Sequence, residues 1–375
     1  MTKLLGVGII GCGNISAAYL QLAPLFKGYK IVAVADINMD NAEARAAEFG
    51  VRAHTVEDLL AADDVDLVIN LTIPAAHVEV SRAILEAGKH VYSEKPFVLS
   101  LEEAQELGDL AKSKGLRIGT APDTFMGASH QLARKLVDDG TIGRVTSGTA
   151  VIMGHGMENW HPNPDFFFLK GAGPILDMGP YYISNLVQLL GPVAKVTSVT
   201  GAAHSERTIA NGPRLGETVP VETPTTIHSV LSFESGAIVT LLASWDVWAH
   251  KHPTMELYGT EGMMDVPDPN FFGGTVSVTE RKGDAVAKEW DTEHPFGVVN
   301  FEDVHANYRG AGLADMALAI TEGRAHRCND AYATHVVEVM TSILDAGEAG
   351  QVMTMKTTCE RPQELGPEEA QALLA

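Results

Sequence analysis

The stretch LLGVGIIGCGNIS, residues 4–16, decides the fold of the N-terminal part of the chain. Its apolar first half predicts a buried strand, and the glycine-rich second half opens a helix directly after it. Gly11 would allow a tight turn, and Gly13 would let the backbone approach a pyrophosphate at the helix N-terminus. The pattern predicts a dinucleotide-binding turn, with Asn14 and Ile15 as further cofactor contacts.

Four more short apolar runs follow, separated by windows with the spacing of amphipathic helices. This alternation is typical of βαβ units, which build a parallel sheet with helices on both faces. The expected strands are Leu4–Ile10, Ile31–Ala35, Val65–Leu71, Lys89–Tyr92 and Leu116–Gly119. We therefore expect an N-terminal, doubly wound Rossmann domain.

An acidic residue ends the second expected strand. Asp36 comes 23 positions after Gly13, where a carboxylate can accept hydrogen bonds from the ribose hydroxyls of adenosine. The same carboxylate would repel a 2′-phosphate, so the sequence favours NAD over NADP. The alternative is that the glycines only turn the chain and that Asp36 caps the next helix. Because strand, turn, helix and acid agree, we favour the cofactor site.

The pattern changes after about Gly119, and a second domain is expected. A chain of 375 residues exceeds the ~250–300 residues that one core can serve. We expect a dinucleotide-binding domain over residues 1–122 and a second domain over residues 123–375. Its expected elements are a strand over 144–153, a helix over 175–190, a loop over 205–222, an antiparallel hairpin over 227–245, and helices over 311–322 and 331–346.

The composition excludes several classes of protein. Against 48 acidic residues stand 27 basic ones, a net charge of −21 that argues against nucleic acid and membrane-surface partners. The three cysteines have no metal-like spacing, and His250 and His252 lack a third ligand, so we expect no metal site. No apolar stretch approaches the ~20 residues of a membrane-spanning helix. The expected location is the cytoplasm.

A lysine follows the fourth expected strand. Ser93-Glu94-Lys95-Pro96 would lie at a carboxyl end of the sheet, where open α/β sheets bind ligands. The Lys95 ammonium can stabilise a developing alkoxide, although a lysine at a strand end is also commonly a solvated surface residue. For any X–Pro bond, including the one before Pro96, the trans form is the expected one.

A second candidate segment is GAGPILDMGPYY, residues 171–182. Asp177 stands among apolar residues and glycines, where an unpaired carboxylate would be costly, so it needs a partner. Tyr181 lies four residues further and would share its helical face. From these residues alone, two interpretations are equally good and both stay open. Asp177 and Tyr181 are either catalytic, or a helix N-cap aspartate followed by a core tyrosine.

The segment from Gly154 to Pro162 combines aromatic, imidazole and carboxylate groups that suit a sugar ring. His161 is the candidate substrate contact in it. A loop anchored by a buried Trp160 is an equally good interpretation.

Taken together, these motifs resemble the Gfo/Idh/MocA family, named after glucose–fructose oxidoreductase, inositol dehydrogenase and a rhizopine-catabolism protein. The resemblance covers about residues 1–346 and rests on GCGNIS, the segment from Thr72 and Pro74 to His77, AGKHVYSEKP, DDGTIGRV at 138–145, and GAGPILDMGPYY. It implies a Rossmann domain followed, over residues 123–375, by an α/β domain for substrate binding and oligomerisation. The large, open, mostly antiparallel sheet of this second domain would form homodimers or homotetramers.

The resemblance also implies site residues. Lys95, Asp177 and Tyr181 map to the catalytic positions, and Thr72, Pro74, His77, Glu94 and Lys95 to the cofactor site. Many members carry histidine where this chain has Tyr181. The stretch 121–125, which includes the candidate substrate contact Asp123, also departs from the family pattern.

The implied activity is hydride transfer between NAD and a carbinol or ketone of a sugar, polyol or related cyclic alcohol. The proton would pass to Tyr181, Lys95 would favour the phenolate, and Asp177 would hold Lys95 or a substrate hydroxyl. Two alternatives are an NADP(H)-dependent reductase or dehydrogenase of a keto-sugar or dihydrodiol, and a non-catalytic NAD-binding sensor or regulator. A complete proton-transfer set argues against the sensor.

Overall fold

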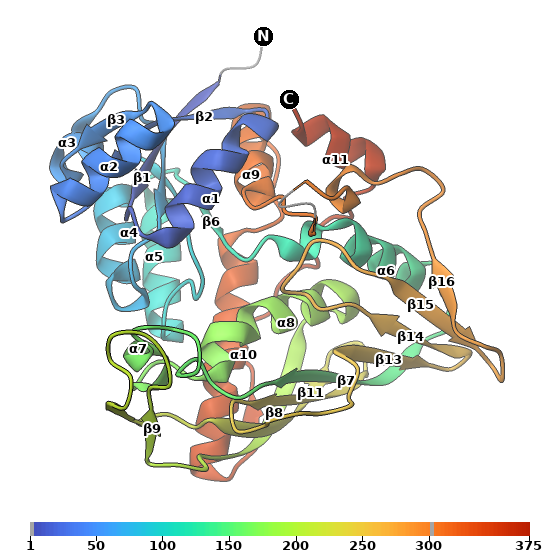
Figure 1. Ribbon diagram of the computed structural model, residues 1–375. Coiled ribbons are helices and arrows are strands. Elements are labelled where there is room, and N and C mark those ends of the chain that lie inside the picture. The colour runs from blue at the N-terminus through green and yellow to red at the C-terminus, as the bar shows by residue number, and fades with distance from the viewer. Residues whose placement is uncertain (1–3, 301–303) are drawn as a thin grey trace.

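The computed structural model describes residues 4–300 and 304–375, and its N-terminal part is a six-stranded parallel sheet (Figure 1). The strand order is β3-β2-β1-β4-β5-β6, in which β1 and β4 are neighbours and the direction of winding reverses between them. Ligands bind in the crevice at such a switch point, outside the carboxyl ends of the strands. The strands are β1 (Leu5–Ile10), β2 (Tyr29–Ala35), β3 (Arg52–His54), β4 (Leu67–Asn70), β5 (His90–Ser93) and β6 (Ile118–Thr120).

Helices cover both faces of this sheet. They are α1 (Asn14–Leu22), α2 (Met39–Phe49), α3 (Val56–Ala61), α4 (His77–Glu86) and α5 (Leu101–Ser113), with short 3-10 turns η1 (Ala23–Leu25) and η2 (Pro74–Ala76). The start of α5 shows how local sequence sets such ends: the Glu103 backbone N–H donates to Ser100 Oγ at 3.2 Å, and Glu103 Oε2 accepts from the Leu99 N–H. These bonds satisfy donors that a helix start leaves unpaired.

The C-terminal part is built on a nine-stranded sheet in the order β16-β15-β14-β13-β7-β12-β11-β8-β17. Only β7 and β12 run parallel to each other among these neighbours, so the sheet is mixed and mostly antiparallel. Its strands are β7 (Val145–Met153), β8 (Val193–Gly201), β11 (Thr226–Phe233), β12 (Ile238–Ser244), β13 (Met255–Gly259), β14 (Gly262–Val266), β15 (Val276–Glu280), β16 (Val286–Lys288) and β17 (Met353–Thr354). The expected fold class is confirmed.

Helices lie on one side of the nine-stranded sheet, where α8 (Pro174–Leu190) is buried along most of its length (Figure 1). The remaining helices of this half of the chain are α6 (Ala128–Asp138), α7 (Asp165–Phe168), α9 (Ala311–Glu322), α10 (Asp330–Ala349) and α11 (Pro367–Leu373), with η3 (Thr124–Met126) and η4 (Pro295–Gly297). Of these, α9 lies beside β6 of the parallel sheet (Figure 1). No helix in the described ranges is long and apolar enough to cross a membrane.

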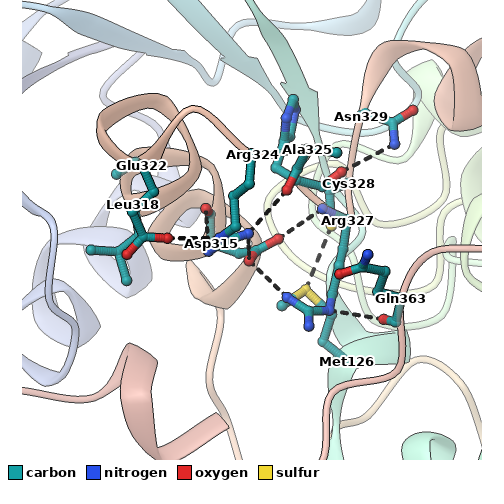
Figure 2. Close-up of polar contacts among 12 residues, drawn as sticks. Met126, Asp315, Leu318, Glu322, Arg324, Ala325, Arg327, Cys328, Asn329 and Gln363 are labelled. Carbon is teal, nitrogen blue, oxygen red and sulfur yellow. Dashed lines mark hydrogen bonds and ion pairs between the residues drawn. The ribbon is translucent and has the colours of Figure 1, made fainter. Parts of the chain in front are cut away.

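The chain returns to the N-terminal sheet near its end. Thr120 of β6 donates its N–H to Cys328 O at 3.0 Å, and Gly119 forms a bridge with Asn329. Figure 2 shows the ion cluster that holds this crossing: the buried Asp315 accepts from Arg324 and Arg327, each at 2.8 Å. Arg327 also donates to the main chain near the C-terminus, at Gln363 O. The two halves are therefore joined by more than one crossing of the chain.

The expected helices and long strands are confirmed within a few residues at each end. Two details are corrected. The predicted loop over 205–222 contains a short hairpin of β9 (Glu206–Thr208) and β10 (Thr218–Pro220), strands too short to give a periodic pattern. The Lys95–Pro96 and Ala121–Pro122 peptide bonds are cis, whereas trans was expected for any X–Pro bond.

Candidate active site

The glycine-rich turn lies between β1 and α1, as predicted. Gly11 has φ +103°, and a Cβ there would lie 2.6 Å from Leu71 O, so only glycine fits without strain. A Cβ on Gly13, by contrast, would have no described heavy atom within 4 Å. Ser16 is buried and its Oγ donates to Gly13 O at 2.6 Å, a bond within the first turn of the helix. The open side of Gly13 is the space that a pyrophosphate needs.

Asp36 lies beside this turn and does not cap the next helix. Its Oδ2 accepts from the Cys12 N–H at 2.8 Å and its Oδ1 from the Asn38 N–H at 2.9 Å. The cap of α2 is Asn38 itself. Both carboxylate oxygens keep further lone pairs for ribose hydroxyls. Burial, together with Asp36, raises the pKa of the Cys12 thiol to about 11, so Cys12 is a neutral filler in the turn.

Two exposed isoleucines flank the turn, and the sequence reasoning missed both. Ile37 follows β2 and is 99% exposed, and Ile73 follows β4 and is 70% exposed. Large apolar side chains so exposed at the ligand edge of a parallel sheet suit the faces of a flat aromatic base. The available signal was their position directly after strands that end at this edge.

Thr72 and Pro74 lie in the loop after β4, and Thr72 is partly buried there. His77, at the start of α4, is fully buried. Its Nδ1 lies 2.7 Å from Pro96 O and its Nε2 lies 3.0 Å from Thr72 O. The imidazole therefore ties the loop after β4 to the loop after β5, and its ring nitrogens face the protein's own main chain.

Lys95 and Asp177 meet although their segments are far apart in sequence. Lys95 Nζ donates to Asp177 Oδ1 at 2.7 Å and to Asp177 O at 2.9 Å. The two side chains are 20% and 22% exposed, so the pair is reachable from solvent. The N-cap of α8 is Gly173, and Asp177 lies in the first turn, so it does not serve as the cap.

Tyr181 completes the constellation, one helical turn beyond Asp177. It is 5% exposed, and Lys95 Nζ lies 5.4 Å from its ring centroid. Burial by itself lowers the pKa of Lys95, but the nearby Tyr181 and Asp177 outweigh it and raise the pKa above the ordinary lysine value. Lys95 is therefore a permanent cation at neutral pH, placed beside a phenol and a carboxylate.

Glu94 is enclosed by protein groups on both oxygens. Oε1 accepts from Arg309 Nη1 at 2.7 Å and from Tyr19 Oη at 3.1 Å, and Oε2 accepts from the Lys95 N–H at 2.9 Å. Glu94 is 7% exposed, and its carboxylate binds the main chain of Lys95. Direct contact between this carboxylate and the cofactor stays a prediction, which these contacts do not favour. Arg309 escaped the sequence reasoning; its one signal was a basic residue just before a glycine-rich helix start.

The Asp123 side chain also binds the protein's own main chain. It is 2% exposed, and its Oδ2 accepts from the N–H groups of Gly310 and Gly312 at 2.9 and 3.0 Å. The predicted substrate contact through Asp123 is therefore disfavoured, because this carboxylate oxygen already binds two main-chain donors. The turn that Asp123 holds is the one that carries Arg309.

His161 lies in an aromatic group on the loop before α8. Its ring stands edge-on to Trp160 at 5.4 Å and to Phe166 at 5.5 Å between centroids. Trp160 is 60% exposed, so it is not the buried anchor of the alternative interpretation. The loop is anchored by an ion pair instead, between the buried Arg207 and Glu158 at 2.9 Å. A substrate contact by His161 stays a prediction.

Within residues 4–300 and 304–375, no group of three or more His, Cys, Asp or Glu side chains is arranged to hold a metal ion. The candidate site is thus a dinucleotide turn, a lysine–aspartate pair and a buried tyrosine at one edge of the parallel sheet.

Comparisons with known proteins agree with this geometry. Levoglucosan dehydrogenase from Pseudarthrobacter phenanthrenivorans is 28% identical over 69% of this chain and 72% of its own length. Inositol 2-dehydrogenase from Klebsiella pneumoniae is 34% identical over 37% of this chain and 43% of its own length. Among solved structures, a levoglucosan dehydrogenase in complex with NADH and L-sorbose has a TM-score of 0.80 at 23% identity, covering 95% of this chain and 100% of that one.

Two sequence models of one family match in succession. The model described as an oxidoreductase family with an NAD-binding Rossmann fold matches residues 5–121, and the family's C-terminal domain model matches residues 130–265. With the dinucleotide turn in the first match and Asp177 and Tyr181 in the second, the chain belongs to the GFO/IDH/MocA family of NAD-binding oxidoreductases.

Proposed function

We propose that this protein oxidises a secondary alcohol of a sugar, polyol or related cyclic alcohol with NAD, and that Tyr181 takes the proton. The observation that carries the proposal is the convergence of Lys95, Asp177 and Tyr181 at the carboxyl end of β5. Relatives named as levoglucosan dehydrogenase, 1,5-anhydro-D-fructose reductase and inositol 2-dehydrogenase support this class of substrate.

The residues fit NAD. The pyrophosphate would lie at the start of α1, against Gly11, Gly13, Asn14 and Ile15, where the open side of Gly13 leaves room for it. Asp36 would bind the adenosine ribose. The loop that carries Thr72 and Pro74 borders the same crevice. When bound, the nicotinamide supplies the hydride acceptor.

The chain's own residues handle the proton. Tyr181 accepts it from the substrate hydroxyl as the C–H bond breaks, and donates it in the reverse direction. Lys95 remains an ammonium throughout, because its pKa is raised, so it stabilises the phenolate and the developing alkoxide without giving up a proton. Asp177 holds Lys95 in place through the 2.7 Å bond.

Charge balance favours an uncharged substrate. Lys95 is paired with Asp177 and Arg309 with Glu94, so each of these two cations already has a carboxylate partner. With a net charge of −21, the protein surface also repels anions. We therefore propose neutral sugars and polyols ahead of sugar phosphates or sugar acids.

The test is a panel of neutral sugars and polyols assayed for NADH formation at saturating NAD. We expect turnover with at least one compound, and a loss of about 10²–10⁴-fold in kcat for Tyr181→Phe. The matched control is Tyr182→Phe, whose hydroxyl donates to Asp268 at 3.2 Å instead. Near-normal turnover of both Tyr181→Phe and Lys95→Ala would contradict the assignment. Tight NAD binding with no turnover on any compound would favour a sensor.

We also propose that the protein forms a homodimer or homotetramer through the nine-stranded sheet. Helices lie on one face of this sheet, and the described side chains left exposed along β8 and β12 include Val199 at 74% and Ile238 at 50%. Exposed apolar side chains on an uncovered sheet face are typical of an interface. Light scattering should give a mass of two or four chains, reduced by Val199→Glu; a monomer at micromolar concentration would contradict this.

A further inference from the structure

We propose that Arg309 is a positioning residue of the active site, which acts through Glu94 to fix the Lys95 main chain and with it the Lys95–Tyr181 pair. The inference rests on the proposed function for its catalytic readout. Arg309 would thus position Lys95, although the two residues are more than 200 positions apart in the sequence.

The contacts form a short relay. Arg309 Nη1 donates to Glu94 Oε1 at 2.7 Å, and the other oxygen of Glu94 accepts from the Lys95 N–H at 2.9 Å. One step further, Lys95 Nζ reaches Asp177 and lies over the Tyr181 ring. Each member touches the next, so displacement of Arg309 is passed to the lysine through one carboxylate.

The relay also reaches the dinucleotide-binding helix. Tyr19 of α1 donates to Glu94 Oε1 at 3.1 Å, and the Arg309 guanidinium lies 5.9 Å from the Tyr19 ring centroid. Glu94 therefore joins three segments: the helix opened by the glycine turn, the end of β5 and the turn before α9. Because the hydride donor and acceptor must meet at near contact, a group that sets the spacing of these segments affects the rate.

Backbone geometry and hydrogen bonds fix the turn that carries Arg309. Gly310 has φ +101°, and a Cβ there would lie 3.1 Å from Tyr29 Oη. Asp123 Oδ2 binds the N–H groups of Gly310 and Gly312, and the Arg309 N–H donates to Asn307 Oδ1 at 3.2 Å. Hydrogen bonds thus fix the backbone around Arg309, and the bond to Glu94 holds its guanidinium.

Charge explains why an arginine is needed. Burial raises the pKa of the Glu94 carboxyl, but the charges of Arg309 and Lys95 hold it below the ordinary value, so Glu94 is ionised. Without Arg309, a carboxylate that is 7% exposed loses a hydrogen-bonded cation, which is costly for a buried charge. Burial by itself lowers the pKa of Arg309, but Glu94 is the first of the nearby groups that outweigh burial and raise this pKa above the ordinary value, so the guanidinium stays charged.

The test uses the full-length protein with four variants: Arg309→Gln, Arg309→Lys, Glu94→Gln and the double variant Arg309→Gln/Glu94→Gln. We expect Arg309→Gln to lower kcat by about 10- to 100-fold, with the KM for the sugar changed much less. Arg309→Lys should recover part of the loss, because it restores the positive charge but not the planar set of N–H donors of a guanidinium. The matched control is Arg281→Gln, an arginine with a 79% exposed side chain paired to Glu261, which should leave kcat unchanged.

The double variant tests the route. If Arg309 acts through Glu94, the double variant loses no more activity than the worse single variant, because the two residues work as a unit. Losses that multiply would overturn the proposal, as would a change in the sugar KM alone, which would mean direct substrate contact. A lowered melting temperature with unchanged kcat would make Arg309 purely structural and would also overturn it.

A substrate-free readout separates this inference from the proposed function. The Lys95 amide, bonded to Glu94 Oε2, should exchange its hydrogen with deuterium faster in Arg309→Gln than in the unchanged protein. If no compound is oxidised but this exchange accelerates, the proposed function fails and the positioning role stands. If sugars are oxidised and the exchange is unaffected, the positioning role fails alone.

Discussion

The ammonium of Lys95 lies 2.7 Å from Asp177 Oδ1, an ion pair between residues 82 positions apart. It joins the loop after β5 to the first turn of α8, and so links the cofactor-binding sheet to the helix that carries Tyr181. The bond both orients the lysine and holds the two halves of the site together.

Asp177→Asn tests this bond. The amide keeps the shape but removes the charge that fixes Lys95, so we expect kcat to fall by about 10²-fold while the affinity for NAD stays within a few-fold. Steady-state kinetics and a fluorescence titration with NAD measure the two quantities. Asp139→Asn, which breaks an exposed lysine–aspartate pair, is the control. Full activity in Asp177→Asn would refute the role of the pair.

Gly11 and Gly13 should respond differently to alanine. Gly11→Ala places a Cβ 2.6 Å from Leu71 O at φ +103°, so we expect a loss of about 1–3 kcal/mol in the free energy of unfolding. Gly13 has φ −69° and free space around its Cβ position, so Gly13→Ala should keep its melting temperature. Its affinity for NAD should drop roughly tenfold or more, ~1.4 kcal/mol. Equal NAD affinity in Gly13→Ala would place the pyrophosphate elsewhere.

Asp36 should set the cofactor preference. Asp36→Ser removes the carboxylate that repels a 2′-phosphate, so we expect the ratio of NADP to NAD affinity to rise at least tenfold. Calorimetric titration with each cofactor gives the ratio. The control is Asp63→Ser, an exposed aspartate before β4 and hence at the opposite edge of the sheet. An unchanged ratio in Asp36→Ser would remove Asp36 from the cofactor site.

Asp315 should matter for stability rather than for chemistry. It is fully buried and accepts from Arg324 and Arg327, so Asp315→Asn leaves Arg327 without its carboxylate partner and Arg324 with Glu322 alone (Figure 2). We expect a loss of about 3–5 kcal/mol, seen as a lower denaturation midpoint. Glu322→Gln removes the more exposed partner of Arg324 and should cost less than about 1 kcal/mol. A smaller effect for Asp315→Asn than for Glu322→Gln would show that the cluster does not hold this crossing.

Stability should fall in mild acid. Burial lowers the pKa of His130 to about 4, and burial also lowers the pKa of His294, His326 and His335. The unfolded chain, with histidine pKa values near ~6.5, binds more protons than the folded one below that pH. The melting temperature should therefore be unaffected by these groups above pH 6.5 and decline as the pH falls toward 4.

His130→Gln separates one contribution. His130 Nε2 lies 2.8 Å from Phe271 O, and a glutamine amide can donate a similar bond without titrating. The variant should show a shallower decline between pH 6.5 and 4. The same slope as in the unchanged protein would mean that His130 does not take up a proton on unfolding.

The sequence alone determined the features whose causes lie within a few neighbouring residues. The tight turn at Gly11, the acid at Asp36 and the i, i+4 spacing of Asp177 and Tyr181 follow from local backbone geometry and periodicity. The parallel sheet of the N-terminal half followed from the same local signals, because alternating strands and helices leave few topologies for a sheet. The large, open sheet of the C-terminal half was expected from the family resemblance.

Only the tertiary structure decided which groups partner which. Glu94 and Asp123 were both expected to contact ligands, yet a distant turn of the chain binds one oxygen of each. Glu94 Oε1 accepts from Arg309, and Asp123 Oδ2 accepts from the N–H groups of Gly310 and Gly312. No periodicity encodes such a return, because a buried carboxylate is satisfied by whichever donors the packing of distant segments brings near it. For the same reason the task of Arg309 is invisible in its own sequence neighbourhood and follows from its contact with Glu94.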